Sequence, residues 1–116
     1  DAAIINLSST AAWIVPKGRG AGMYSASKYA VRSLTEGLRA ELVLEHSSIK
    51  LAAISPGIVD TEFHEQAARG GTVQVDDSAF KSLEGADVAD AILYVLAAGP
   101  NVQVNEIVLR PIEQLI

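Results

Sequence analysis

Three short apolar runs along the chain lack the alternation of apolar and polar residues that a half-exposed strand shows. Such runs are typical of strands that are buried on both faces, as in parallel sheets. They predict strands over residues 2–8, 49–55 and 104–110. Each run ends in polar residues or at a proline, which mark the points where strands stop.

Two longer segments show helical periodicity instead. From Met23 to about His46, apolar residues recur every four positions and predict a helix. This apolar stripe consists of Ala30, Leu34, Leu38 and Leu42. The pattern leaves open whether the stripe packs within one chain or against a second copy of it.

Residues 86–98 predict a second helix, capped by Ala86-Asp87 and ended by Gly99-Pro100. Its expected apolar face consists of Val88, Ala91, Ile92, Val95 and Leu96. We expect a glycine-rich loop over residues 10–22, and a polar segment over 58–82 with a short helix around 62–68. The order strand, helix, strand, helix, strand predicts an α/β fold of right-handed βαβ units on a parallel sheet.

The composition narrows the function. The 116 residues suffice for one domain, and 49% hydrophobic residues suffice for a core. Nine Lys and Arg against 14 Asp and Glu give a net charge of −5, which argues against binding to nucleic acid. The chain has no Cys, which excludes disulfides and fits a cytoplasmic location. Because it also has only two His, the composition argues against a metal site. No apolar run reaches the roughly 18–20 residues of a membrane span.

One group of residues has a spacing that indicates catalytic chemistry. Tyr24 and Lys28 lie four positions apart at the start of the first predicted helix, so they share one helix face. A lysine ammonium beside a phenol stabilises the phenolate, and a phenol tuned in this way can exchange a proton with an alcohol or carbonyl oxygen. Ser9 lies 15 positions before Tyr24, at the carboxyl end of the first strand, where open α/β sheets bind ligands.

These segments resemble the short-chain dehydrogenases/reductases over essentially the whole chain. Residues 4–9 (IINLSS) are similar to the family's fifth strand and catalytic serine, and residues 24–31 (YSASKYAV) to its Tyr-x-x-x-Lys helix. Residues 55–63 (SPGIVDTEF) are similar to the segment after the sixth strand. Residues 105–111 (NEIVLRP) are similar to the last strand of a subgroup that acts on 3-hydroxy acids and related small alcohols.

The resemblance implies a partial Rossmann-like, doubly wound parallel sheet that contains the last three strands of the fold. It also implies an oxidoreductase that interconverts a secondary alcohol or hydroxy acid and its carbonyl by hydride transfer with NAD or NADP. In the family pattern Ser9 would hydrogen-bond the substrate oxygen, and Tyr24 would be the acid/base. Lys28 would bind the nicotinamide ribose and assist Tyr24.

The family pattern also assigns a cofactor pocket. Pro56 and Gly57 would shape the pocket of the nicotinamide, and Ile58 and Thr61 would touch its carboxamide or the phosphates. Residues 62–82 would form the substrate loop that closes over the site. The resemblance also implies a small alcohol or carbonyl compound as substrate, and a homodimer or homotetramer when the protein is full length.

The chain begins at Asp1, inside a predicted strand, and lacks the glycine-rich phosphate-binding turn with which the family opens. We therefore expect residues 1–116 to be the C-terminal half of one domain, with the N-terminal cofactor-binding half absent. The alternative is a catalytically incomplete fragment that acts only as a folding or oligomerisation module.

Other signals are weaker. Gly18-x-Gly20 imitates a dinucleotide fingerprint, but Met23 stands where the third glycine belongs. Ser25-Ala26-Ser27-Lys28 has the spacing of a β-lactamase nucleophile motif, whose partner motifs are absent. His46 suits a helix end, and His64 suits the surface. Trp13 fits either the substrate mouth or simple packing.

Overall fold

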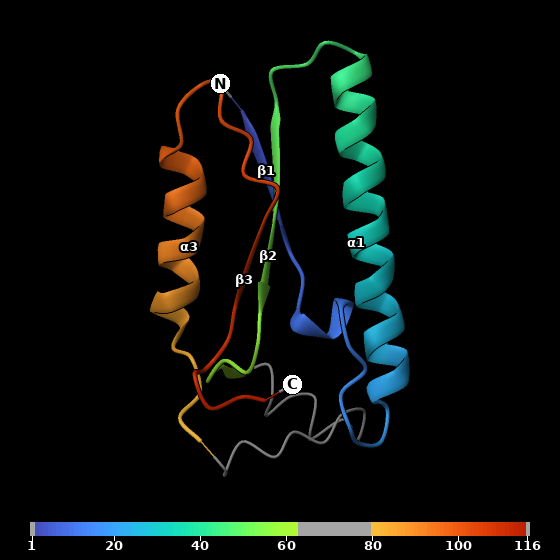
Figure 1. Cartoon of the computed structure of the whole chain (residues 1–116), viewed down its shortest axis with the longest axis vertical. Helices are drawn as coiled ribbons and strands as arrows, with labels where there is room; N and C mark the ends of the chain where they lie inside the picture. The colour runs from blue at the N-terminus through green and yellow to red at the C-terminus, as the bar shows by residue number, and fades with distance from the viewer. Residues whose placement is uncertain (1, 63–79, 116) are drawn as a thin grey trace.

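The computed structural model describes residues 2–62 and 80–115. In chain order its elements are β1 (Ala3–Leu7), the 3-10 helix η1 (Thr10–Ala12), α1 (Ala21–Leu44), β2 (Lys50–Pro56), α3 (Gly85–Ala97) and β3 (Glu106–Leu109) (Figure 1). The expected α/β alternation is confirmed. The helix expected around 62–68 and most of the expected substrate loop lie outside the described residues.

The three strands form one parallel sheet in the order β1-β2-β3. Ala3 of β1 pairs with Lys50 at the start of β2, and Leu7 pairs with Ile54. On the other side of β2, Pro56 pairs with Leu109. Because all strands run the same way, their carboxyl ends meet at one edge of the sheet, the lower edge in Figure 1.

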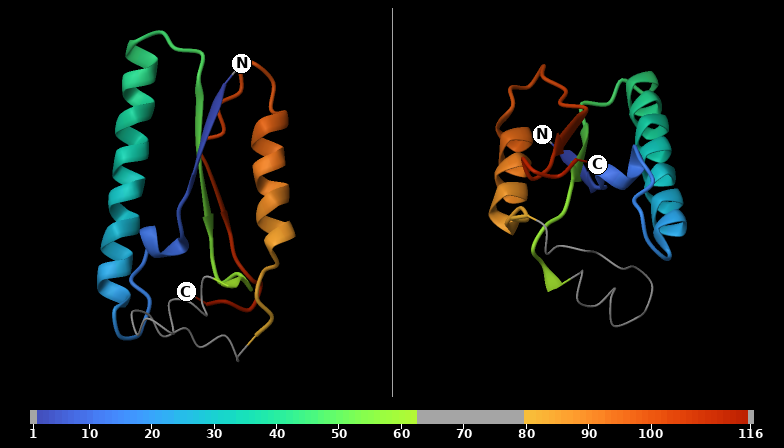
Figure 2. Two further views of the ribbon diagram at one scale, coloured as in Figure 1. Left: turned by 180° about the vertical axis from the view of Figure 1, so that it is seen from behind. Right: turned by 60° about the horizontal axis from the view of Figure 1, so that its bottom comes forward.

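The helices α1 and α3 cover opposite faces of this sheet and give a three-layer arrangement (Figure 2). Because the strands lie in chain order, crossovers on opposite faces have opposite hands, so the expectation that both βαβ units are right-handed is wrong for one of them. The face beneath α3 is apolar, and its buried centre is Ala52, Ile54 and Val95. Partly buried apolar residues surround this centre: Ile5, Val88, Ala91, Ile92, Val104, Ile107 and Leu109. Four of the five residues expected to form the apolar face of this helix belong to the core. The fifth, Leu96, is exposed, so that part of the prediction is wrong.

On the other face, polar contacts join α1 to the sheet beside the buried Leu51 and Ala53 of β2. The buried residues of this helix are Ala21, Ser25 and Thr35. Thr35 Oγ1 accepts a hydrogen bond from Asn6 Nδ2 at 2.8 Å and donates one to the carbonyl of Val31 at 2.7 Å. Within the apolar stripe, Leu34 is 72% exposed and Leu38 is 38% exposed. The stripe therefore faces mostly away from the chain's own core.

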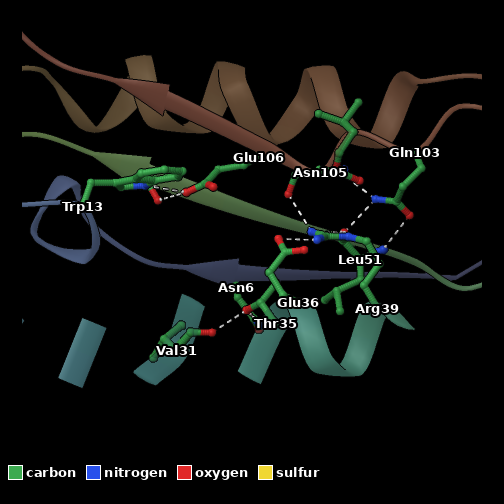
Figure 3. A network of polar contacts seen from close by, with 12 residues as sticks. Asn6, Trp13, Val31, Thr35, Glu36, Arg39, Leu51, Gln103, Asn105 and Glu106 are labelled. Atoms are coloured by element: carbon green, nitrogen blue, oxygen red, sulfur yellow. Dashed lines mark hydrogen bonds and ion pairs between the residues drawn. The ribbon is translucent and has the colours of Figure 1, made fainter. Parts of the chain in front are cut away.

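Just before β3 begins, the side-chain amide of Gln103 bonds the backbone of β2 in place of a paired strand (Figure 3). Gln103 accepts a hydrogen bond from the Leu51 N–H at 3.2 Å and donates one to the Leu51 carbonyl at 2.7 Å. The guanidinium of Arg39 donates to the carbonyls of Leu51 and Asn105, at 3.1 and 2.8 Å. The third strand thus starts at Glu106, two residues later than expected, since side chains satisfy the backbone before it.

Local capping moves two helix boundaries from their expected places. α1 begins at Ala21, two residues before Met23, because Gly20 adopts a left-handed conformation (φ 78°) that lets the chain turn into the helix. The N-cap of α3 is Glu84 and not Ala86-Asp87. The Glu84 N–H donates to the Asp87 carboxylate at 2.8 Å, and both halves of a capping box are present.

We expect the Ile54→Ala variant to lower the free energy of unfolding by about 2–5 kcal/mol, because it leaves a cavity in the core. Ile54 is fully buried in the central strand, whereas Ile112 is fully exposed. Ile112→Ala is therefore the matched control and should stay within about 0.5 kcal/mol of the parent. Urea denaturation measures both, and equal losses in the two variants would contradict the assigned core.

Candidate active site

The first strand ends against the central strand at the carboxyl edge. The Ser8 N–H donates to the Ile54 carbonyl at 2.7 Å, which continues the pairing of β1 and β2 by one residue. Ser8 is buried, and its hydroxyl has no hydrogen-bond partner among the described residues. Ser9 is only partly buried. Of the two serines, Ser9 is therefore the more exposed residue.

Ser9 also shapes the loop that follows it. It is the N-cap of η1, a short helix inside the segment expected to be a loop, and its Oγ accepts a hydrogen bond from the Ala11 N–H at 3.1 Å. The backbone of Ser9 is extended, which is the usual conformation of a capping residue. Because this contact uses a lone pair of the oxygen, the hydroxyl hydrogen can still be donated.

Tyr24 and Lys28 lie together on the first turns of α1, as their spacing predicts. The Lys28 ammonium is 5.8 Å from the centroid of the Tyr24 ring. The same ammonium donates to the Leu7 carbonyl at 3.4 Å, so it reaches the end of β1. Both side chains are half-buried. The pair thus lies at the edge of the sheet that also carries Ser9.

Ser25 fixes this pair to the loop that carries Ser9. Its side chain is 1% exposed, and its Oγ donates to the Ala11 carbonyl at 2.6 Å, with the Ile14 carbonyl 3.2 Å away. The sequence pattern did not indicate a role for Ser25 in this site. The available signal was its position one residue after Tyr24, which turns it inward on a helix whose Tyr24 and Lys28 face the edge.

Trp13 is held by charged neighbours just beyond the loop. Its indole N–H donates to Glu106 Oε1 at 3.1 Å (Figure 3). The same oxygen accepts a hydrogen bond from the Ser55 hydroxyl at 2.6 Å. The guanidinium carbon of Arg32 lies 3.2 Å from the centroid of the Trp13 ring, a cation–π arrangement. Glu106 thereby links the first loop to the end of β2, a connection that the sequence did not indicate.

The turn after β2 carries the remaining expected residues. Pro56 ends the strand, and the Gly57 N–H donates to the Leu109 carbonyl at 2.7 Å. The Ile58 N–H donates to the side-chain oxygen of Gln114 at 3.0 Å. Thr61 is exposed and follows the turn. The structure thus brings this turn to the same edge of the sheet as Ser9, Tyr24 and Lys28.

The described residues hold no group of three or more His, Asp or Glu that could bind a metal ion. His46 follows the end of α1 in a left-handed conformation (φ 53°). His64 lies outside the described residues. No described helix is both long and apolar enough to cross a membrane.

Comparison with known sequences gives a consistent result. The family model described as short chain dehydrogenase matches residues 1–70. Dehydrogenase/reductase SDR family member 11 of Mus musculus is 42% identical over 119 residues, which cover 99% of this chain and 45% of that protein. Farnesol dehydrogenase of Aedes aegypti is 37% identical over 113 residues, which cover 97% of this chain and 43% of that protein. The chain thus spans a little under half the length of these relatives.

Comparison with solved structures gives the same fold. The crystal structure of serine dehydrogenase from Escherichia coli matches with a TM-score of 0.70 and 28% identity, over 97% of this chain and 41% of that one. The closed form of a serine dehydrogenase complexed with NADP+ matches with a TM-score of 0.78 and 24% identity, over 97% of this chain and 45% of that one. At that identity the second match shows likeness of fold alone.

We expect Ser25→Ala to lower the free energy of unfolding by about 1–3 kcal/mol, because it leaves the buried Ala11 carbonyl without its donor. Ser27→Ala is the matched control, since the exposed hydroxyl of Ser27 bonds only the Tyr24 carbonyl of its own helix. Thermal or urea unfolding of both variants tests the assignment. A Ser25→Ala variant as stable as Ser27→Ala would contradict it.

Proposed function

This chain belongs to the short-chain dehydrogenase family, and we propose that it supplies the catalytic residues of an NAD(P)-dependent oxidoreductase. The substrate class is a secondary alcohol or hydroxy acid and the corresponding carbonyl compound. The observation that carries the proposal is the Tyr24–Lys28 pair, whose ammonium reaches the carboxyl end of β1 where Ser9 follows. The relatives named as dehydrogenases support the reaction class.

Each residue has a role in alcohol oxidation that its position supports. The Ser9 hydroxyl donates a hydrogen bond to the substrate oxygen and orients it. Tyr24 takes the hydroxyl proton of the substrate as the carbonyl forms, and returns a proton in the reverse direction. The positive charge of Lys28 stabilises the negative charge that the phenolic oxygen carries after it has given up its proton.

The residues at this edge suit one end of a nicotinamide cofactor. An ammonium can donate to ribose hydroxyls, and the turn after β2 has a glycine where a larger residue would collide with the side chains of Gln114 and Arg110. Lys28 would hold the ribose, and Pro56, Gly57, Ile58 and Thr61 would line the nicotinamide. When bound, NAD or NADP accepts or donates the hydride.

The proposed activity also requires a binding site for the pyrophosphate of the cofactor. A pyrophosphate is held by a glycine-rich turn at a helix N-terminus in folds of this type. On this proposal residues 1–116 form the C-terminal half of one domain, and that turn comes from outside them. The chain's share of its relatives' length supports this division.

We expect Tyr24→Phe to lower turnover by at least about 100-fold, since it removes the proton that the reaction exchanges. Tyr29→Phe is the matched control, because Tyr29 is an exposed tyrosine on the same helix. NAD(P)H formation by the full-length gene product, over a panel of small secondary alcohols and hydroxy acids, measures both. Circular dichroism checks that the fold is kept, and near-parent turnover in Tyr24→Phe would overturn the proposal.

The alternative role, a folding or oligomerisation module, rests on the outward face of α1. Leu34 and Leu38 expose apolar surface on a helix that uses other residues to contact its own sheet. Exposed apolar surface of this kind marks contacts between proteins. We propose that this face joins copies of the chain into a homodimer or homotetramer, an assembly that is compatible with the enzyme as well as with the module.

We expect Leu34→Glu to shift the protein toward monomers, because a carboxylate in an apolar contact loses its hydration. Ser33→Glu, an exposed neighbour on the same helix, is the control for the added charge. Light scattering coupled to size exclusion measures the molar mass. An unchanged molar mass of the Leu34→Glu variant would show that this face does not join the copies.

A further inference from the structure

The C-terminal tail folds back against the turn that follows β2. After β3 the Gln114 N–H donates to the Pro111 carbonyl at 3.1 Å, and an Arg110 guanidinium nitrogen donates to the Leu115 carbonyl at 3.0 Å. These contacts close the tail on itself. The result places the side chain of Gln114, which is only 7% exposed, directly beside Gly57 and Ile58.

The fit between tail and turn is tight. A Cβ atom built on Gly57 would lie 2.8 Å from the Cβ of Arg110 and closer still to the Gln114 side-chain oxygen. No residue with a side chain fits at this position unless the tail moves. The glycine that follows Pro56 is therefore explained by the tail and needs no left-handed backbone.

Ile58 is held on both sides. Its N–H donates to the Gln114 side-chain oxygen at 3.0 Å, and its carbonyl accepts from the Leu83 N–H at 2.9 Å. These two hydrogen bonds fix the direction of the backbone on either side of the residue. Only the first of them comes from a side chain, so it alone can be removed by substitution.

We infer that Gln114 is a positioning residue, which sets the shape of the turn Pro56–Ile58 and through it the affinity for the nicotinamide cofactor. This inference rests on the proposed function, which places that turn beside the nicotinamide. On this inference Gln114 acts through the turn and not through a contact of its own with the cofactor. Without its acceptor the Ile58 peptide can rotate, and part of the binding free energy is then spent on reordering the turn.

The test uses Gln114→Met in the full-length gene product, because methionine keeps the volume and lacks a strong acceptor. Gln114→Asn keeps the amide but shortens the side chain by one methylene group. It is the second variant, used if methionine disturbs folding. Glu113→Gln, an exposed change in the same tail, is the matched control. The readouts are amide hydrogen exchange at Ile58 by NMR and titration with NADPH followed by fluorescence.

We expect Ile58 to exchange about tenfold faster in the Gln114 variants, and NADPH to bind about tenfold more weakly, with turnover at saturating NADPH near that of the parent. Glu113→Gln should match the parent in all three. Unchanged exchange and affinity overturn the inference, and so does faster exchange with unchanged affinity, which would leave Gln114 a structural contact. A parent protein that neither binds NADPH nor turns over substrate overturns the proposed function instead, while the exchange at Ile58 still reports the contact.

Discussion

The central strand β2 is hydrogen-bonded along both edges and covered on both faces, and the positions of the other elements follow from it. Parallel pairing with β1 and β3 forces each connection to cross a face of the sheet, and α1 and α3 cross opposite faces of it. It also brings every strand's carboxyl end to one edge. Ser9, the turn at Gly57 and the tail after β3 are neighbours for this reason, although they lie far apart in the sequence.

The two faces of the sheet are stabilised in different ways. Beneath α3 the contacts are apolar, and sequence periodicity identified most of them, since Val88, Ala91 and Val95 recur at helical spacing. Beneath α1 the contacts run through Thr35, Arg39 and other polar groups. Hydrogen-bonding residues such as these add no apolar position to the pattern of the helix sequence. The visible stripe on that helix, with Leu34 at its centre, belongs to the surface that faces outward.

The sequence predicted the order and type of the elements and the shared face of Tyr24 and Lys28, because period and spacing act locally. It did not predict the contacts between distant segments. Ser25, Glu106 and Gln114 each bind a backbone or side chain that only the folded sheet brings near. The caps at Gly20 and Glu84 were also not predicted: the first depends on a left-handed backbone conformation, and the second on a reciprocal capping box with Asp87.

The chain has one tryptophan, and it lies between the serine loop and the helix that carries Tyr24. Trp13 is stacked against the Arg32 guanidinium, and its indole N–H is bound to the Glu106 carboxylate. A movement of that loop would change the distance of a positive and a negative charge from a single indole ring. Among these 116 residues, therefore, the intrinsic tryptophan emission has one origin, and its wavelength reports the positions of these two charges without any added label.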